Sequence, residues 1–365
     1  MSNAESLDKK AQRVILDKAK EAFKFEGDYA DLKGIADLVS REGTLLQLDD
    51  IKPYEPNDLR ALLDDKKGKE DRYTGGLLGY GLNKFKHIES DLDGIQAGLY
   101  VIGGDTNIGK TAFLTNLFLD VIETNPKLYG LFFSLDDDLG TILNRLLAIR
   151  ADIPLNAIKK PNTALDKARK DSRDSAYDYI RGLANDRVNV YDSTKIQSFE
   201  ILEHHIKRAL VDNKKSGKEL IIAIDGLQNL DTGEDEQNIR EKNIARANLI
   251  KGLVNRYSVP ILTTVELRKR AVGQKQDSEP TLNDIMETGK FAYNANYVWL
   301  LSLDDRDNLE QVSLRVGKNK LSESKAGRYL RFNRQTAGMT ETGELIQTRA
   351  EETPKARNKE RGIKY

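Results

Sequence analysis

The sequence predicts an α/β domain in which helices cover both faces of a mostly parallel sheet. From residue 73 onward, short apolar runs alternate with longer amphipathic runs. This alternation is typical of repeated strand–helix units and therefore of a parallel sheet. A glycine-rich stretch, residues 104–111, also lies between the first apolar run and the first amphipathic run. These observations together predict the fold class.

Each element follows from its own pattern. The apolar runs are short and continuous rather than alternating with polar residues, as expected for strands buried on both faces. Predicted strands cover residues 98–103, 128–135, 187–191, 220–224, 260–264, 297–302 and 312–316. Predicted helices cover residues 111–123, 141–151, 198–213 and 238–256. The last strands follow one another closely, which favours an antiparallel edge to the sheet.

The first 71 residues have a different character. Apolar residues recur at helical spacing over residues 6–25, and further helical stretches cover residues 29–40 and 58–65. Residues 66–71 are almost all charged and are predicted to be a linker. The tail from residue 351 is basic with little apolar content, which predicts disorder. The expected organisation is an N-terminal helical region with its linker at 5–71, a main domain at 72–348 and a disordered tail at 349–365.

Composition excludes several kinds of site. The chain has no cysteine and three histidines, so disulfides, cysteine-based zinc sites and a thiol nucleophile are ruled out. Its formal net charge is zero, so any binding to nucleic acid must come from local patches or from an oligomer. No run of about 18 apolar residues suggests a membrane span, and no signal peptide is recognisable. We therefore expect a cytoplasmic protein that does not contact a membrane.

The glycine-rich stretch fits the pattern G-x-x-x-x-G-K-[ST] between a strand and a helix. In this pattern, glycines let backbone N–H groups face an anion, and the helix N-terminus adds positive charge. Lys110 is expected to reach the β- and γ-phosphates of ATP, and Thr111 to bind Mg²⁺. The expected loop residues are Gly104, Asp105, Thr106, Asn107, Ile108, Gly109, Lys110, Thr111 and Ala112.

A carboxylate at the end of another predicted strand complements this loop. Residues 220–224 are apolar and are followed directly by Asp225. An acid at the tip of a neighbouring strand holds the magnesium ion in many phosphate-loop enzymes. The pattern is common on its own, but beside the phosphate loop it predicts that Asp225 binds Mg²⁺ together with Thr111.

Further motifs, in order, resemble the ATPase half of replicative helicases of the DnaB type. Residues 131–136 (LFFSLD) are similar to the family's FSLE strand end, and residues 225–228 (DGLQ) to its DYLQ motif. Residues 259–268 resemble VPVVALSQLNR, residues 284–289 resemble DLRESG, and residues 317–320 (GKNK) resemble GKQR. The order and spacing hold over about residues 74–335. The resemblance implies a RecA-like phosphate-loop fold.

The resemblance also implies roles for particular residues. Asp136 takes the place of the acid that polarises the attacking water, and Arg145 falls where the family also carries an arginine on the nucleotide side. Gln228 matches a glutamine that senses the state of nucleotide or DNA. Lys318 and Lys320 match the hairpin that reaches the ATP site of the next subunit. The implied assembly is a ring, expected to be hexameric, with ATP between subunits and single-stranded DNA in its channel.

The sequence departs from the family in four places. Asp136 is one methylene shorter than glutamate and is followed by two more aspartates, which leaves the identity of the acid open. Lys320 replaces the arginine finger and lacks its planar fork. Val265 and Glu266 replace serine and glutamine. Residues 5–71 do not resemble the family's N-terminal helical domain, which favours a trimmed phage or mobile-element helicase, with replication or phage partners, or a relative with another task.

Two loops are candidates for contact with DNA. The loop after Asp225, residues 231–238, is acidic, whereas the loop at residues 268–276 is basic. The expected contacts to the DNA backbone are Arg268, Lys269, Arg270 and Lys275. A solvated turn is the alternative interpretation of this basic segment.

Several alternatives stay open from the sequence alone. The N-terminal helix either packs on its own domain or docks on a neighbouring subunit. The chain is either a helicase or translocase on single-stranded DNA, or a RecA- or KaiC-like ATPase whose assembly responds to nucleotide, or a scaffold that binds nucleotide without turnover. Stimulation of turnover by DNA distinguishes the first of these from the others.

Overall fold

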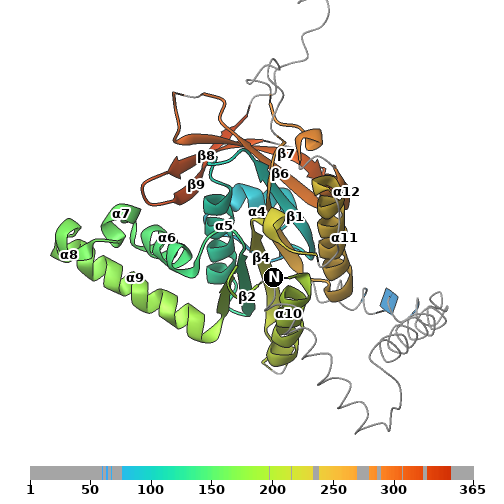
Figure 1. Cartoon of the computed structure of the whole chain (residues 1–365), viewed down its shortest axis with the longest axis horizontal. Coiled ribbons are helices and arrows are strands. Elements are labelled where there is room, and N and C mark those ends of the chain that lie inside the picture. Colours follow the sequence, from blue (N-terminus) through green and yellow to red (C-terminus); the bar gives the residue numbers. More distant parts are fainter. Residues whose placement is uncertain are drawn as a thin grey trace, which may run out of the picture. The chain divides into compact units, whose positions relative to one another are not determined.

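The computed structural model describes residues 76–346 except 197, 215, 233–237, 269–278, 286–288, 306 and 324–326, together with Arg60, Leu63, Asp64 and Lys67. By its contacts the chain divides into two compact units, Met1–Gly76 and Leu77–Tyr365. All the labelled helices and strands in Figure 1 belong to the second unit. The helices expected at 6–25, 29–40 and 58–65 and the tail from residue 349 lie outside the described residues, apart from the four isolated positions.

The described residues form one nine-stranded sheet in the order β3-β2-β4-β5-β1-β6-β7-β8-β9. All pairs from β3 to β6 are parallel, and all pairs from β6 to β9 are antiparallel. The strands are β1 (Gly98–Gly104), β2 (Leu128–Ser134), β3 (Val188–Asp192), β4 (Glu219–Asp225), β5 (Pro260–Glu266), β6 (Tyr297–Ser302), β7 (Gln311–Asn319), β8 (Arg328–Asn333) and β9 (Gly338–Leu345). The expected fold class, a mostly parallel sheet with an antiparallel edge, is confirmed.

Helices cover both faces of this sheet (Figure 1). Helices α4, α5, α6 and α9 contribute to the core on one face, and α10, α11 and α12 to the core on the other. The helices are α4 (Lys86–Leu92), α5 (Lys110–Thr124), α6 (Leu139–Ala151), α7 (Leu155–Ile158), α8 (Pro161–Ala164), α9 (Lys167–Asp186), α10 (Phe199–Lys214), α11 (Ile239–Tyr257) and α12 (Lys290–Asn294), with short 3-10 turns η1 (Leu227–Asn229) and η2 (Leu282–Asp284).

The central strands are buried because successive side chains enter different cores. In β1, Tyr100 and Ile102 pack in the core that contains α5, whereas Leu99 and Val101 pack in the core that contains α11. This follows from the two-residue period of a strand. Burial on both faces explains why the predicted strands are continuous apolar runs, and it fixes the sheet as the rigid support for the loops at its edge.

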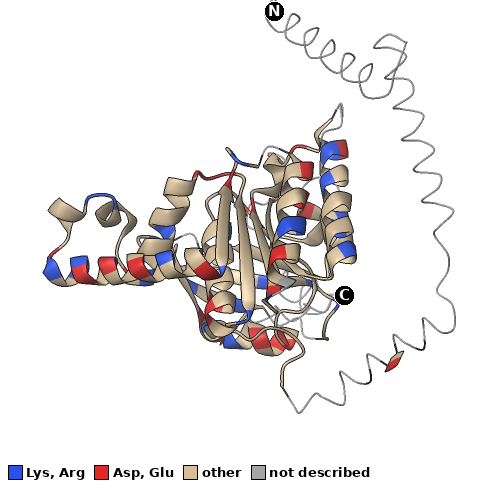
Figure 2. Ribbon diagram, turned by 90° about the horizontal axis from the view of Figure 1, so that it is seen from below, with Lys and Arg blue, Asp and Glu red and all other residues tan. Residues whose placement is uncertain are grey.

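The structure adds elements that the apolar patterns do not predict. Helix α9 is 20 residues long but buries only Ala176 and Leu183, and its surface carries closely mixed acidic and basic residues (Figure 2). Together with α6, α7 and α8 it forms an arm on the β2–β3 side of the sheet (Figure 1). Strands β8 and β9 also escaped prediction, because exposed polar residues interrupt their apolar pattern.

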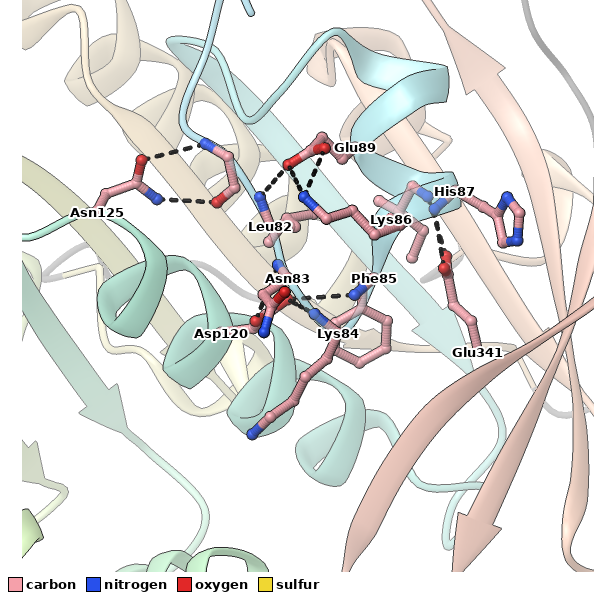
Figure 3. A network of polar contacts seen from close by, with 12 residues as sticks. Leu82, Asn83, Lys84, Phe85, Lys86, His87, Glu89, Asp120, Asn125 and Glu341 are labelled. Carbon is pink, nitrogen blue, oxygen red and sulfur yellow. Dashed lines mark hydrogen bonds and ion pairs between the residues drawn. The ribbon is translucent and has the colours of Figure 1, made fainter.

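A polar network fixes the segment before β1 to the first helix after it (Figure 3). The carboxylate of Asp120, on α5, accepts hydrogen bonds from the backbone N–H groups of Asn83, Lys84 and Phe85 at 2.9 to 3.2 Å. Glu341 of β9 similarly accepts from the backbone of His87, at 2.9 Å. Burial raises the pKa of Asp120, and the three backbone donors only partly offset this shift. The network therefore holds the start of α4 against both α5 and β9.

We expect Asp120→Ala to lower the free energy of unfolding by about 3 kcal/mol, because three N–H groups lose their acceptor in a buried setting. Asp120→Asn is the matched control, since its amide oxygen still accepts, and we expect it to cost less than half as much. Urea unfolding followed through the fluorescence of Trp299 measures both. Equal losses in the two variants would contradict the importance of the backbone bonds.

No helix among the described residues is long and apolar enough to cross a membrane.

Candidate functional site

The glycine-rich stretch forms a tight loop between β1 and α5. Asn107 and Gly109 have positive φ angles of 63° and 109°, a region that glycine enters easily. A Cβ at Gly104 would lie 2.7 Å from the side chain of Ile108, and a Cβ at Gly109 would lie 2.9 Å from the ring of Phe332. The loop therefore requires both glycines and leads directly into the N-terminus of α5, where free N–H groups attract anions.

Lys110 begins α5 and points back over the loop. Its Nζ donates a hydrogen bond to the backbone oxygen of Asp105 at 2.9 Å. Burial lowers the pKa of Lys110, and carboxylates oppose this shift, Glu266 most strongly and then Asp225, Asp105 and Asp136. The ammonium group thus lies among several negative charges, near the position that a phosphate group would take.

Thr111 and Asp225 meet as the sequence pattern predicts. The Thr111 hydroxyl lies 2.8 and 3.0 Å from the two carboxylate oxygens of Asp225. Thr264, on β5, donates to the same carboxylate at 2.7 Å. Asp225 is only 2 % exposed, and burial raises its pKa, although the bonds from Thr264 and Thr111 lower it.

This pair fits a magnesium ion. Mg²⁺ in such sites uses one or two carboxylates together with waters and phosphate oxygens. A buried carboxylate beside a hydroxyl and an anion-binding loop supplies that donor set, and a cation would offset the charge that burial disfavours. The residues present are therefore compatible with Mg²⁺ bound between Thr111, Asp225 and a nucleotide.

The three consecutive aspartates after β2 have different surroundings. Asp137 pairs with Arg145 of α6 at 2.6 Å. Asp138 caps the N-terminus of α6 by accepting from the backbone of Thr141 at 3.0 Å. Asp136 is exposed, and its carboxylate accepts only a long bond of 3.3 Å from Asn229 among the hydrogen bonds of the described residues.

Asp136 therefore suits a role towards a ligand better than its two neighbours, whose carboxylates stabilise local structure. Its place at the C-terminal end of β2 supports this choice. Ser134 pairs with Asp225 in the register of β2 and β4, so Asp136 lies only two residues beyond the level of Asp225. The sequence alone did not distinguish these three acids.

Arg145 and Gln228 lie near the same C-terminal ends of the parallel strands. Arg145 is held by Asp137. Burial raises the pKa of Asp225, and the positive charge of Arg145 offsets part of this rise. Gln228 belongs to η1, immediately after β4, and its buried Oε1 accepts no hydrogen bond from the described residues. Ala112 is buried in the first turn of α5. All three positions are therefore within the region that the sequence assigned to the nucleotide.

Lys318 and Lys320 lie at the opposite end of the strands from the phosphate loop. In the strand register, Gly104 pairs with Leu301 of β6, and Leu301 pairs with Leu314 of β7. Strand β7 then runs away from the phosphate loop. Lys320 is six residues beyond Leu314, a distance of about 20 Å in extended chain. The structure therefore does not bring these lysines to the phosphate loop of their own chain.

The two lysines differ in their contacts. The Nζ of Lys318 donates to the backbone oxygens of Ala292 and, at 2.8 Å, Tyr293. Burial and the neighbouring Lys320 lower the pKa of Lys318 to about 8. The side chain of Lys320 is exposed. Tyr293 beside them is 73 % exposed. This end of the strands therefore exposes positive charge and an aromatic ring to solvent.

Only part of the predicted nucleic-acid segment is described. Arg268 is exposed and follows β5 by two residues, with its backbone N–H bonded to the oxygen of Asp284 at 2.6 Å. It lies at the same end of the strands as the phosphate loop, because Glu266 pairs with Gly104. Lys269, Arg270 and Lys275 lie outside the described residues, as do residues 233–237 of the acidic loop.

Some residues that complete the site were not predicted from the sequence. Thr264 bonds to Asp225, and Asn229 bonds to Asp136. Arg334, in the turn between β8 and β9, donates to the backbone oxygen of Asn107 at 3.2 Å. Arg334 lies far along the chain from the phosphate loop, and the contacts of Asn229 and Thr264 join segments that are distant in sequence, so no local pattern predicts these bonds. Only the position of Thr264 on a predicted strand, next to the replaced residues 265 and 266, offered a hint.

Comparison with known proteins identifies relatives. The chain is 24 % identical over 327 residues to the replicative DNA helicase DnaB of Leifsonia xyli, covering 85 % of this chain and 67 % of the relative. It is 26 % identical over 235 residues to a probable replicative DNA helicase of Trieres chinensis, covering 61 % of this chain and 49 % of the relative. The chain spans about half the length of most of the curated relatives compared.

Solved structures share the fold. One of them, described as an ATPase domain, superposes with a TM-score of 0.68 at 19 % identity, covering 78 % of this chain and 99 % of that domain. A DnaB-like replicative helicase, described with its interactions with primase, also gives a TM-score of 0.68 at 19 % identity, covering 92 % of this chain and 76 % of the other. Residues 81–345 match the family described as the DnaB-like helicase C-terminal domain. The chain therefore belongs to the DnaB-like helicase C-terminal domain family.

Proposed function

We propose that this chain is an ATP-hydrolysing helicase or translocase motor that acts on single-stranded DNA as a ring, with ATP bound between adjacent copies. The observation that carries the proposal is that two groups of charged residues lie at opposite ends of the strands. Lys110, Thr111 and Asp225 gather where the parallel strands end, whereas Lys318 and Lys320 lie where the parallel strands begin. A head-to-tail arrangement of copies would bring one end to the other, and such an arrangement forms a ring when the rotation between copies closes.

Each residue then has a part in the reaction. Lys110 and the N–H groups of the loop bind the β- and γ-phosphates. Thr111 and Asp225 would hold Mg²⁺, which would neutralise charge on the phosphate oxygens. Asp136 orients the attacking water and accepts its proton. Lys318 and Lys320 of the next copy stabilise the negative charge that develops on the transferred phosphoryl group.

The remaining residues support these parts. Arg145 positions Asp137 and adds positive charge near Asp225. Gln228 has a buried amide oxygen that a rearranged partner or a water on the nucleotide side would satisfy. Arg268, with Lys269, Arg270 and Lys275 after it in the sequence, contacts the phosphates of DNA. Affinity for DNA should therefore fall steeply as salt rises, because bound cations are released from the strand.

ATP hydrolysis with and without single-stranded DNA tests the proposal. We expect DNA to stimulate turnover severalfold, because motors of this kind couple the two ligands. Lys110→Ala should lower turnover at least a hundredfold in both conditions, since the ammonium that contacts the β- and γ-phosphates is lost. Strand displacement on a forked duplex then distinguishes unwinding from movement alone.

Turnover that DNA does not change would contradict the motor function. It would favour an ATPase whose assembly responds to nucleotide, an alternative to which the replacement of arginine by Lys320 also points. Nucleotide binding without any turnover would favour a scaffold. Mass measurement in the presence of ATP follows the ring in all three cases.

A further inference from the structure

Glu266 places a negative charge directly against the phosphate loop. It is the last residue of β5 and pairs in register with Gly104, where the loop begins. Its Oε1 accepts a hydrogen bond from the hydroxyl of Thr106, within the loop, at 3.2 Å. Its carboxylate is also the strongest of the negative charges that act on Lys110.

The neighbouring carboxylates are accounted for in other ways. Asp225 faces Thr111 and Thr264 at the proposed metal site. Asp136 lies near Asn229 at the end of β2. Glu266 has contacts of neither kind: it is bonded to the loop itself and attracts the same ammonium that would bind the β- and γ-phosphates. Its carboxylate therefore adds negative charge beside the phosphate loop without contacting Thr111 or Asp225.

We propose that Glu266 is an internal competitor of the nucleotide: its carboxylate, bonded to Thr106 of the phosphate loop, places a negative charge where it opposes the binding of the γ-phosphate of ATP. This inference deepens the proposed function and rests on the same nucleotide site. The carboxylate is bonded to Thr106, and its charge acts on Lys110 without a direct bond. A phosphate bound by Lys110 and the carboxylate of Glu266 repel each other, because both are negative.

A consequence concerns the choice between ATP and ADP. Lys110 is expected to contact the β- and γ-phosphates, and the γ-phosphate brings additional negative charge to the vicinity of Glu266. Repulsion therefore weakens the binding of ATP more than the binding of ADP. Glu266 lowers the ratio of ATP affinity to ADP affinity, which promotes exchange of nucleotide instead of permanent occupation by ATP.

The test compares Glu266→Gln with the unaltered chain. Glutamine has almost the same size and still accepts a hydrogen bond from Thr106, but it carries no charge. We expect ATP to bind about tenfold more tightly to the variant and ADP at most about threefold more tightly, because only the charge repulsion is removed. Equilibrium titration with fluorescent ATP and ADP analogues in the presence of Mg²⁺, without DNA, gives both dissociation constants.

Asp105→Asn is the matched control. It removes a carboxylate that also acts on Lys110, but there the backbone oxygen rather than the carboxylate binds the lysine. An equal gain in ATP affinity in this control would show a general charge effect and overturn the specific role of Glu266. Unchanged or weaker ATP binding in Glu266→Gln would overturn it as well.

Turnover provides an independent distinction. If Glu266→Gln binds ATP as the unaltered chain does but loses hydrolysis a hundredfold or more, Glu266 would be a catalytic base and not a competitor. Binding of ATP and ADP by the unaltered chain is measured first. If it binds neither, the proposed function itself fails, whereas failure of the Glu266 role leaves nucleotide binding intact.

Discussion

Asp136→Asn is expected to lower ATP turnover about a thousandfold while ATP binding stays nearly unchanged. A positioned base contributes between about a hundredfold and ten-thousandfold to such reactions. Asp136 is the aspartate after β2 whose carboxylate is free of strong structural bonds among the described residues. Asparagine keeps the shape and the contact with Asn229 but cannot accept a proton from water. Single-turnover hydrolysis and nucleotide titration measure the two quantities separately.

The adjacent aspartates supply matched controls. Asp137→Asn loses the ion pair with Arg145, and Asp138→Asn keeps a side chain that caps helices almost as well as aspartate. We expect either change to lower turnover less than about tenfold, because neither carboxylate acts on the water directly. If Asp137→Asn loses the thousandfold and Asp136→Asn does not, the assignment of the acid is wrong.

Lys320→Ala is expected to lower turnover of the assembled protein by a hundredfold or more. A positive group supplied by a neighbouring subunit stabilises the charge of the transition state and is worth between about a thousandfold and a hundred-thousandfold in phosphoryl transfer when it is arginine. Lysine lacks the planar fork and should give less. Binding of ATP to separate, unassembled subunits should not change, because Lys320 lies at the opposite end of the strands from the phosphate loop of its own chain.

Mixing two inactive variants tests whether Lys320 acts on a neighbour. A Lys110→Ala chain keeps Lys320, and a Lys320→Ala chain keeps its phosphate loop. In a mixed ring, roughly a quarter of head-to-tail interfaces combine the two intact halves, and turnover should recover there. A mixture that stays as inactive as its components would contradict a role between subunits. Lys318→Ala in place of Lys320→Ala reports whether the neighbouring lysine contributes in the same way.

The local patterns were sufficient for the elements that bury most of their surface. All seven predicted strands are present, and the four helices predicted after residue 72 match α5, α6, α10 and α11 within a few residues. Apolar burial on two faces produces continuous runs that are easily recognised. Helix α9 and strands β8 and β9 were not predicted, since their exposed faces carry charge and their apolar pattern is short. Their stability comes from contacts with neighbouring elements rather than from local sequence.

The phosphate site shows the same division. The loop from Gly104 to Thr111 could be identified from sequence, because a backbone that binds phosphate needs glycines, a lysine and a hydroxyl at fixed spacing. Asp225 could be identified because it ends an apolar strand. The tasks of Asp136, Asp137 and Asp138 were not separated from sequence. The cap between Asp138 and Thr141 is local, whereas the position of Asp136 beside Asn229 arises only after β2 and β4 have paired.

The sequence by itself thus determined the fold class, the glycine-rich loop and the strand that ends in Asp225, because each depends on residues that are close together along the chain. Tertiary structure decided which aspartate is free, that Glu266 touches the loop, and that Lys318 and Lys320 lie at the opposite end of the strands from it. These facts depend on strand order and register. Strand order and register arise when segments that are distant along the chain pair in one sheet, as β1 does with β5 and β6, which lie more than a hundred residues further on. No local pattern records that pairing.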